Sequence, residues 1–258
     1  MRTFRKAGTR RAIATEVASL RWLSEATPAG GAAVVELAGS GETWLETVLL
    51  DEGTPTRAHA AEFGRRLALT HAAGAKWWGE APPGLDPADL ATANLPTPAA
   101  AVPTWGSFGE YYAEGRLRPY VAMATGLEPE DTRLLHRVCD AVATGRFDSP
   151  QPALCGEVAR IHGDLWAGNV VWTADGVGTL IDPCANGGHA ETDLAELALF
   201  GNGQISDILD GYCEVSPPEE GLSQRMPLHQ LHMLLVHVVL FGGGYVPMAL
   251  KVARGLLR

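Results

Sequence analysis

The stretch His162-Gly163-Asp164-Leu165-Trp166-Ala167-Gly168-Asn169, with Leu180-Ile181-Asp182-Pro183 after it, decides how this sequence folds. Between the two stretches, the apolar runs 170–172 and 178–181 flank Asp175-Gly176, a pattern that predicts a β-hairpin. Such a hairpin would bring Asn169 close to Asp182. We therefore expect one carboxamide and one carboxylate to face a common point, with a second carboxylate, Asp164, nearby in the sequence.

These side chains suit phosphoryl transfer. Mg²⁺ prefers hard oxygen ligands and usually completes its shell with phosphates and water, so Asn169 and Asp182 are predicted metal ligands. In-line transfer also needs a group that orients the acceptor hydroxyl and accepts its proton, the role predicted for Asp164. The order H-x-D-x-x-x-x-N, followed by a strand-terminal Asp, is that of a kinase catalytic loop. Single Asp and Asn residues often only cap turns, but the complete string favours catalysis.

Composition and charge narrow the class of protein. The 258 residues are 46% hydrophobic and 19% charged, which suits one large domain or two lobes that share a cleft. A net charge of −10 argues against a nucleic-acid or anionic-membrane partner. No apolar segment follows the charged start, and the apolar run 231–241 is too short to span a bilayer, so we expect a cytoplasmic protein.

The remaining pattern is mixed helix and strand. Apolar spacing predicts helices over 10–26 and 57–74, and strands over 33–37 and 43–50 joined by a turn at 38–42. Residues 80–104 contain so many prolines that no regular element is expected there. We interpret this segment as a loop over the cleft rather than a linker between lobes. From residue 111 onward, helical patterns predominate outside the hairpin.

The sequence resembles the fructosamine kinase (ketosamine-3-kinase) family, within the aminoglycoside-phosphotransferase branch of the protein-kinase-like fold. Two features carry the resemblance most specifically: the Trp after His-Gly-Asp-Leu, and the string Asp193-Leu194-Ala195-Glu196-Leu197-Ala198-Leu199-Phe200-Gly201. The stretches 229–237 and 241–245 also match. The resemblance extends over nearly the whole chain and is strongest over 160–245.

The resemblance implies an α+β, two-lobed, protein-kinase-like fold. A truncated N-terminal lobe would span 1–50, and a mainly helical C-terminal lobe would span 51–258. It also implies ATP and Mg²⁺ as cofactors, with Lys6 holding the α- and β-phosphates and Glu16 orienting Lys6. Only five residues precede Lys6, so either the start codon is misassigned or this is a compact variant without a phosphate-covering loop.

By the same resemblance, the reaction is phosphorylation of the 3-hydroxyl of ketosamines, free or on protein lysines, for protein deglycation. Trp166 is a candidate for lining the substrate site, and His189 and Glu191 are weaker candidates near the acceptor entrance. His162 is expected to brace the loop. Asp193 is expected either to cap a helix starting at Leu194 or to brace the catalytic loop.

Two alternatives remain open at this point. A kinase of the same fold could act on an aminoglycoside, a sugar or an amino-alcohol. A pseudokinase could bind nucleotide or a partner protein without catalysis. The sequence leaves the acceptor and the oligomeric state undecided.

Overall fold

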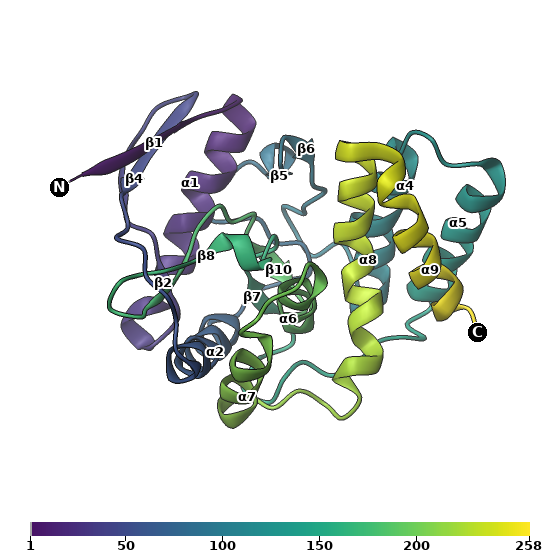
Figure 1. Cartoon of the computed structure of the whole chain (residues 1–258). Helices are drawn as coiled ribbons and strands as arrows, with labels where there is room; N and C mark the ends of the chain where they lie inside the picture. Colours follow the sequence, from purple (N-terminus) through teal and green to yellow (C-terminus); the bar gives the residue numbers. More distant parts are fainter. Residues whose placement is uncertain (1) are drawn as a thin grey trace.

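A small antiparallel sheet and one helix form the N-terminal end of the molecule in the computed structural model, which describes residues 2–258 (Figure 1). The strand order is β1-β4-β3, with β1 at Thr3–Ala7, β3 at Leu37–Ser40 and β4 at Trp44–Val48. Helix α1 (Arg10–Ser24) packs on this sheet, burying Ile13 and Val17 against Leu45. The predicted helix over 10–26 is therefore present and ends slightly earlier.

The predicted hairpin exists, but its first strand and its turn were placed wrongly. Residues 37–40 form β3, and the turn to β4 starts only at Gly41. The register of this pair shifts between Leu37 and Gly39, as expected for a β-bulge. The earlier run, β2 (Ala33–Val34), instead pairs in parallel with β9 (Gly178–Leu180). The first residues of the predicted strand thus pair with a strand that is distant in the sequence, and local periodicity cannot reveal such a partner.

Short strands carry the catalytic segment at the centre of the molecule. The predicted hairpin is present as β8 (Val170–Trp172) and β9, paired in the register Val170 to Leu180. Strand β7 (Ala159–Ile161) pairs with β10 (Asn186–Gly188), after which α6 (Ala190–Leu199) begins. Both segments 162–169 and 181–185 therefore leave paired strands, which fixes their ends relative to each other.

Most of the remaining chain is helical. Near the hairpin, α2 (Arg57–Ala72) packs against α7 (Ile205–Val215). At the other end lie α5 (Pro129–Ala143), α8 (Leu222–Phe241) and α9 (Val246–Leu256), together with α3 (Phe108–Tyr111), a π-helical segment at Tyr112–Leu117 and α4 (Arg118–Met123) (Figure 1). Their buried side chains form the largest core cluster, which includes Tyr112, Val138 and Leu235.

Helix α8 is long and apolar enough to cross a bilayer when taken with the turn after it, Leu222–Gly244. Half of that apolar window is nevertheless buried inside the protein, where α8 packs against α4, α6 and α9. Its buried residues include His229 and His232. This environment is typical of the core helix of a soluble protein.

The proline-rich segment contains more regular structure than its sequence predicts. A 3₁₀ turn at Pro87–Asp89 leads into β5 (Ala91–Thr92), which pairs with β6 (Leu95–Pro96). The expectation of no regular element was therefore wrong, because a two-residue turn and side-chain contacts stabilise a short hairpin that includes Pro96. We call residues 86–98 the strap. Its position agrees with a segment draped over the cleft, since residues 91–94 line the cleft described next.

Candidate active site

A cleft of about 320 Å³ lies between the β1–α1 unit, the strap and the segment 164–184. Residues from all three parts line it, including every residue predicted for phosphoryl transfer. Its lining comprises Lys6, Ala7, Gly8, Ala12, Ile13, Thr15, Glu16, Ala91, Thr92, Ala93, Asn94, Asp164, Trp166, Asn169, Asp182, Pro183 and Cys184. The cleft therefore brings together residues from near the N-terminus and from the segment 164–184, which lie far apart in the sequence.

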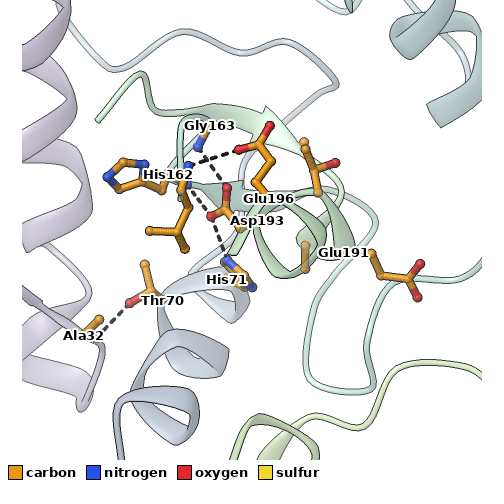
Figure 2. A network of polar contacts seen from close by, with 12 residues as sticks. Ala32, Thr70, His71, His162, Gly163, Glu191, Asp193 and Glu196 are labelled. Atoms are coloured by element: carbon orange, nitrogen blue, oxygen red, sulfur yellow. Dashed lines mark hydrogen bonds and ion pairs between the residues drawn. The ribbon is translucent and has the colours of Figure 1, made fainter. Parts of the chain in front are cut away.

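The loop before Asp164 is held from below by a buried carboxylate on α6. The backbone amides of His162 and Gly163 donate to Asp193 at 2.7 and 3.0 Å (Figure 2). His71 contacts the same carboxylate at 3.0 Å, and these hydrogen bonds lower the pKa of Asp193 against the opposing effect of burial. Helix α6 begins at Ala190, so Asp193 is not an N-cap and the bracing alternative is correct.

Two further side chains fix the same loop. Glu196, one helical turn after Asp193, accepts a hydrogen bond from the Leu165 amide at 3.0 Å (Figure 2). Complete burial raises the pKa of Glu196 well above its usual value. The His162 ring contacts the Ile181 carbonyl at 2.9 Å and thus links the loop to the hairpin, in agreement with the bracing role predicted for it. The backbone that carries Asp164 is therefore held on both sides.

Asp164 and Asn169 lie side by side, as their spacing predicts. The Asn169 Nδ2 donates to the Asp164 carbonyl at 2.7 Å and contacts its carboxylate at 3.4 Å. This contact leaves the Asn169 Oδ1 as the free ligand atom of the amide. Burial and the nearby negative charge of Asp182 raise the pKa of Asp164 to about 7. A carboxyl group with that pKa can accept a proton near neutral pH.

Lys6 and Asp182 connect this loop to the N-terminal sheet. The Lys6 Nζ lies 2.8 Å from Glu16 Oε2 and 3.0 Å from Asp182 Oδ2. The ion pair expected between Lys6 and Glu16 is therefore present. Burial acts to lower the pKa of Lys6, but the two carboxylates outweigh it and raise this pKa. Burial, together with the Asp182 charge, raises the pKa of Glu16 to about 7 despite the bond from Lys6.

The donor set fits a magnesium ion. Asp182 has a left-handed backbone (φ 53°), a strained conformation for a non-glycine residue that is common at functional sites. Its side chain remains 44% exposed in the cleft. An amide oxygen from Asn169 and a carboxylate from Asp182 are hard ligands that would leave positions for phosphate oxygens and water. Asn169 and Asp182 are thus the residues that would hold the metal.

A second, more apolar slot of about 190 Å³ opens under the β1–β4 pair. Phe4, Val35, Leu49, Leu50, Val171 and Ile181 provide its apolar lining. Two lining residues of the slot are close in sequence to cleft residues, since Phe4 is two residues from Lys6 and Ile181 is adjacent to Asp182. A flat aromatic base fits such a slot, because apolar walls bury its faces. Sequence reasoning missed these residues, since isolated apolar positions carry no motif.

Trp166, the candidate for lining the substrate site, lies in the cleft wall and is 39% exposed. Its ring meets Phe200 edge-on at 6.5 Å. An exposed indole beside a candidate proton acceptor can cover the apolar face of an organic substrate. The strap residues Thr92–Asn94 complete the lining and were not expected as individual site residues.

His189 and Glu191 do not belong to the cleft, contrary to the prediction that they contact substrate. Both are buried, and Figure 2 shows Glu191 pointing away from the catalytic loop. Glu191 pairs with Arg225 from α8 at 2.8 Å, and His189 packs against Phe108 and His229. The N-terminus of α6 turns these side chains into the helical core, a direction that the sequence did not indicate.

His189, Glu191 and His229 bring their ligand atoms within 4.8 Å of one another, a spacing that could hold a metal ion. Each group, however, is already bonded to protein. The His189 ring contacts the Ser149 carbonyl through Nε2 and accepts a hydrogen bond from the Glu191 amide at Nδ1. The His229 Nδ1 lies 2.9 Å from the Thr192 hydroxyl. Arg225 neutralises the Glu191 carboxylate. The cluster is therefore best described as a buried polar network.

Comparison with known proteins agrees with this geometry. A model of the family described as "Fructosamine kinase" matches residues 3–258. A probable ketoamine kinase from Synechocystis sp. is 32% identical over 222 residues, which cover 85% of this chain and 69% of the relative. A solved structure of a candidate fructosamine-3-kinase from Thermobifida fusca superimposes with a TM-score of 0.84 and 40% identity, covering 99% of this chain and 85% of that one.

More distant structures agree in fold alone. A choline kinase from Streptococcus pneumoniae superimposes with a TM-score of 0.62 at 14% identity, covering 99% of this chain and 85% of the other. The expected α+β, two-lobed, protein-kinase-like fold is therefore confirmed.

Proposed function

The chain belongs to the fructosamine kinase family and is a phosphotransferase with an alcohol acceptor, and we propose that it phosphorylates ketosamines with ATP and Mg²⁺. The acceptor group would be the 3-hydroxyl of a fructosamine or ribulosamine adduct, free or on a protein lysine. The name of the Synechocystis relative, a probable ketoamine kinase, supports this acceptor class. The role would be removal of sugar adducts, in the cytoplasm.

One observation carries this proposal: Asp164 lies beside Asn169, and Lys6 bridges Glu16 and Asp182 in the same cleft. Phosphoryl transfer requires little covalent chemistry from a protein, so positioning and charge compensation dominate catalysis. The site offers an amine for phosphate oxygens, two oxygen ligands for a metal and one carboxylate for the acceptor. These are the requirements of the proposed reaction.

Each residue would have a separate task. The Lys6 ammonium would bind the α- and β-phosphates, and Glu16 would hold that ammonium in place. Asn169 and Asp182 would hold Mg²⁺, which would neutralise charge on the β- and γ-phosphates. Asp164 would accept a hydrogen bond from the sugar hydroxyl, orient it toward the γ-phosphorus and take up its proton. The apolar slot beneath β1 and β4 would hold the adenine.

The reducing environment of a cytoplasm suits this chain. All four cysteines are free thiols, and burial raises the pKa of Cys184, which lines the cleft, to about 11. Free buried cysteines are typical of proteins that fold where thiols remain reduced. Cys184 would therefore stay neutral beside the substrate.

An acceptor panel tests the proposal. Purified protein would be incubated with Mg²⁺, radiolabelled ATP and, separately, fructoselysine, ribuloselysine, an aminoglycoside or choline. We expect label in the ketosamines, with the phosphate on O3 by NMR. Labelling of only the aminoglycoside or choline would assign the chain to the first alternative. Absence of labelling with every acceptor, despite nucleotide binding, would favour the non-catalytic alternative.

A further inference from the structure

The tip of the strap has a left-handed backbone conformation that Asn94 tolerates but Ala93 disfavours. Ala93 and Asn94 form the two-residue turn between β5 and β6, with φ angles of 47° and 71°. Positive φ at both positions is the pattern of a type I′ turn, for which Asn-Gly is the usual sequence. A left-handed Ala is costly, and such strain is frequent at ligand clamps and active sites. Contacts elsewhere in the strap must therefore hold the tip in place.

Buried hydrogen bonds anchor the base of the strap to the C-terminal helices. The Thr97 hydroxyl accepts a hydrogen bond from the Thr92 amide at 3.0 Å and lies 2.9 Å from the Tyr120 hydroxyl. Arg116, in the π-helical segment, donates to the Pro98 carbonyl at 2.6 Å. All of these side chains are buried. The strap is thus a fixed part of the large lobe rather than a free loop.

The tip and the 3₁₀ turn reach across to α1 in the small lobe. The Thr9 hydroxyl donates a hydrogen bond to Asn94 Oδ1 at 2.7 Å. The same hydroxyl accepts a hydrogen bond from the Ala12 amide and so caps the N-terminus of α1. Further along α1, the Thr15 hydroxyl donates to the Asp89 carbonyl at 2.8 Å and accepts a hydrogen bond from the Ala91 amide at 3.1 Å. Helix α1 also carries Glu16, the partner of Lys6. The strap therefore touches the helix that positions the phosphate-binding lysine.

The same tip lines the cleft that contains Asp164 and Trp166. Asn94 is exposed there, and its Nδ2 forms no hydrogen bond with residues 2–258, while its Oδ1 accepts from Thr9. A carboxamide both donates and accepts hydrogen bonds, so it can recognise neutral hydroxyl groups. If the reacting hydroxyl lies at Asp164, the neighbouring part of the acceptor would occupy the space of this cleft that the phosphates and the metal leave free. The wall formed by the strap bounds that space.

We propose that Asn94 is a specificity-determining residue that hydrogen-bonds the non-reacting hydroxyls of the sugar portion of the acceptor. The inference rests on the proposed ketosamine kinase function and adds a recognition element from the strap. A polyol fits this position because it offers both donors and acceptors, whereas the tip carries no charged side chain to pair with an ionic group. The rigid base of the strap would present the carboxamide with little loss of conformational entropy.

Substitution of Asn94 by glycine separates recognition from folding. Glycine adopts the left-handed conformation readily, so Asn94→Gly keeps the turn while removing the carboxamide. Loss of one or two neutral hydrogen bonds should raise the KM for ribuloselysine or fructoselysine about five- to twentyfold. The variant also loses the bond from Thr9, but Thr9 still caps α1 through the Ala12 amide and Lys6 still pairs with Glu16. The KM for ATP should therefore change by less than about twofold. Ala93→Gly is the control, because it places a glycine in the same turn without removing a polar side chain. Its KM values therefore show the effect of the glycine backbone alone.

The outcomes are distinguishable. A rise in acceptor KM for Asn94→Gly that clearly exceeds that of Ala93→Gly, with ATP KM nearly constant, supports the assignment. Equal acceptor KM in wild type and Asn94→Gly would overturn it, as would equal effects of the two glycine substitutions or a parallel rise in ATP KM. If the wild-type enzyme phosphorylates no ketosamine, the proposed function fails and this inference fails with it.

Discussion

Lys6 and Glu16 form an ion pair, with the Nζ 2.8 Å from Oε2, that joins the edge strand β1 to helix α1. Glu16 is almost fully buried, whereas Lys6 is only partly covered and also reaches Asp182. The pair therefore presents the ammonium to the cleft at a fixed position. Removal of its buried partner should let Lys6 move.

Glu16→Gln tests this positioning. The variant keeps the size of the side chain but removes the charge that holds the ammonium, so we expect the KM for ATP to rise about tenfold, equivalent to about 1.4 kcal/mol. Steady-state kinetics with varied ATP would measure it. Glu46→Gln is a matched control, because Glu46 pairs with Arg5 on the exposed part of the same sheet. Similar ATP KM values in the two variants would count against the role of Glu16.

Asp182→Asn addresses the metal site. An amide is a weaker ligand than a carboxylate, so the Mg²⁺ concentration for half-maximal turnover should rise at least tenfold. A magnesium titration of the rate at saturating ATP would show this shift. The control is Asp175→Asn in the exposed turn of the same hairpin, where the carboxylate contacts only Thr173 among the described side chains. An unchanged magnesium requirement in Asp182→Asn would remove this residue from the metal site.

The Glu191–Arg225 pair predicts a stability effect outside the cleft. Burial alone would raise the pKa of Glu191, but bonds from Arg225 and His229 outweigh it and lower the pKa to about 2. A depressed pKa means that this stabilisation is present above pH about 4.5 and is lost as the pH falls toward 2. Glu191→Gln should therefore lower the free energy of unfolding at pH 7 by about 3 kcal/mol and weaken the acid dependence in that window.

Chemical denaturation followed by circular dichroism, at several pH values, would measure this difference. Glu62→Gln is a suitable control, because Glu62 pairs with Arg65 and Arg66 on the surface of α2 and should contribute less than about 1 kcal/mol. Equal stability losses in both variants at pH 7 would contradict the description of Glu191 as a buried structural charge.

The catalytic segment could be predicted from sequence because its chemistry is local. Asp164 and Asn169 share one loop, and a short hairpin with a clear turn connects Asn169 to Asp182, so spacing alone predicted their convergence. Lys6 and Glu16 required the family resemblance. Asp182, which Lys6 also contacts, lies far away in the sequence, and a lysine near a chain end has no distinctive local pattern.

The parts that sequence could not predict depend on long-range packing. The strand predicted over 33–37 is interrupted because its first residues form β2, which pairs in parallel with β9. The hydrogen bond between Thr9 and Asn94, which are far apart in the sequence, connects the strap to α1. Glu191 was expected in the acceptor entrance because it follows Asp182 closely, but α6 turns it toward Arg225. Sequence proximity to a site does not specify which face of a helix a side chain occupies.

Single-turnover measurement of Asp164→Asn with ribuloselysine and magnesium–ATP tests the central claim most directly. The variant keeps the shape of the side chain and removes the group that accepts the hydroxyl proton. We expect the rate of phosphoryl transfer to fall by about 10²- to 10⁴-fold, which is the usual contribution of general-base catalysis. The affinity for nucleotide should change by less than about threefold. A rate equal to that of the wild type would contradict the assignment of Asp164, and with it the mechanism built on this cleft.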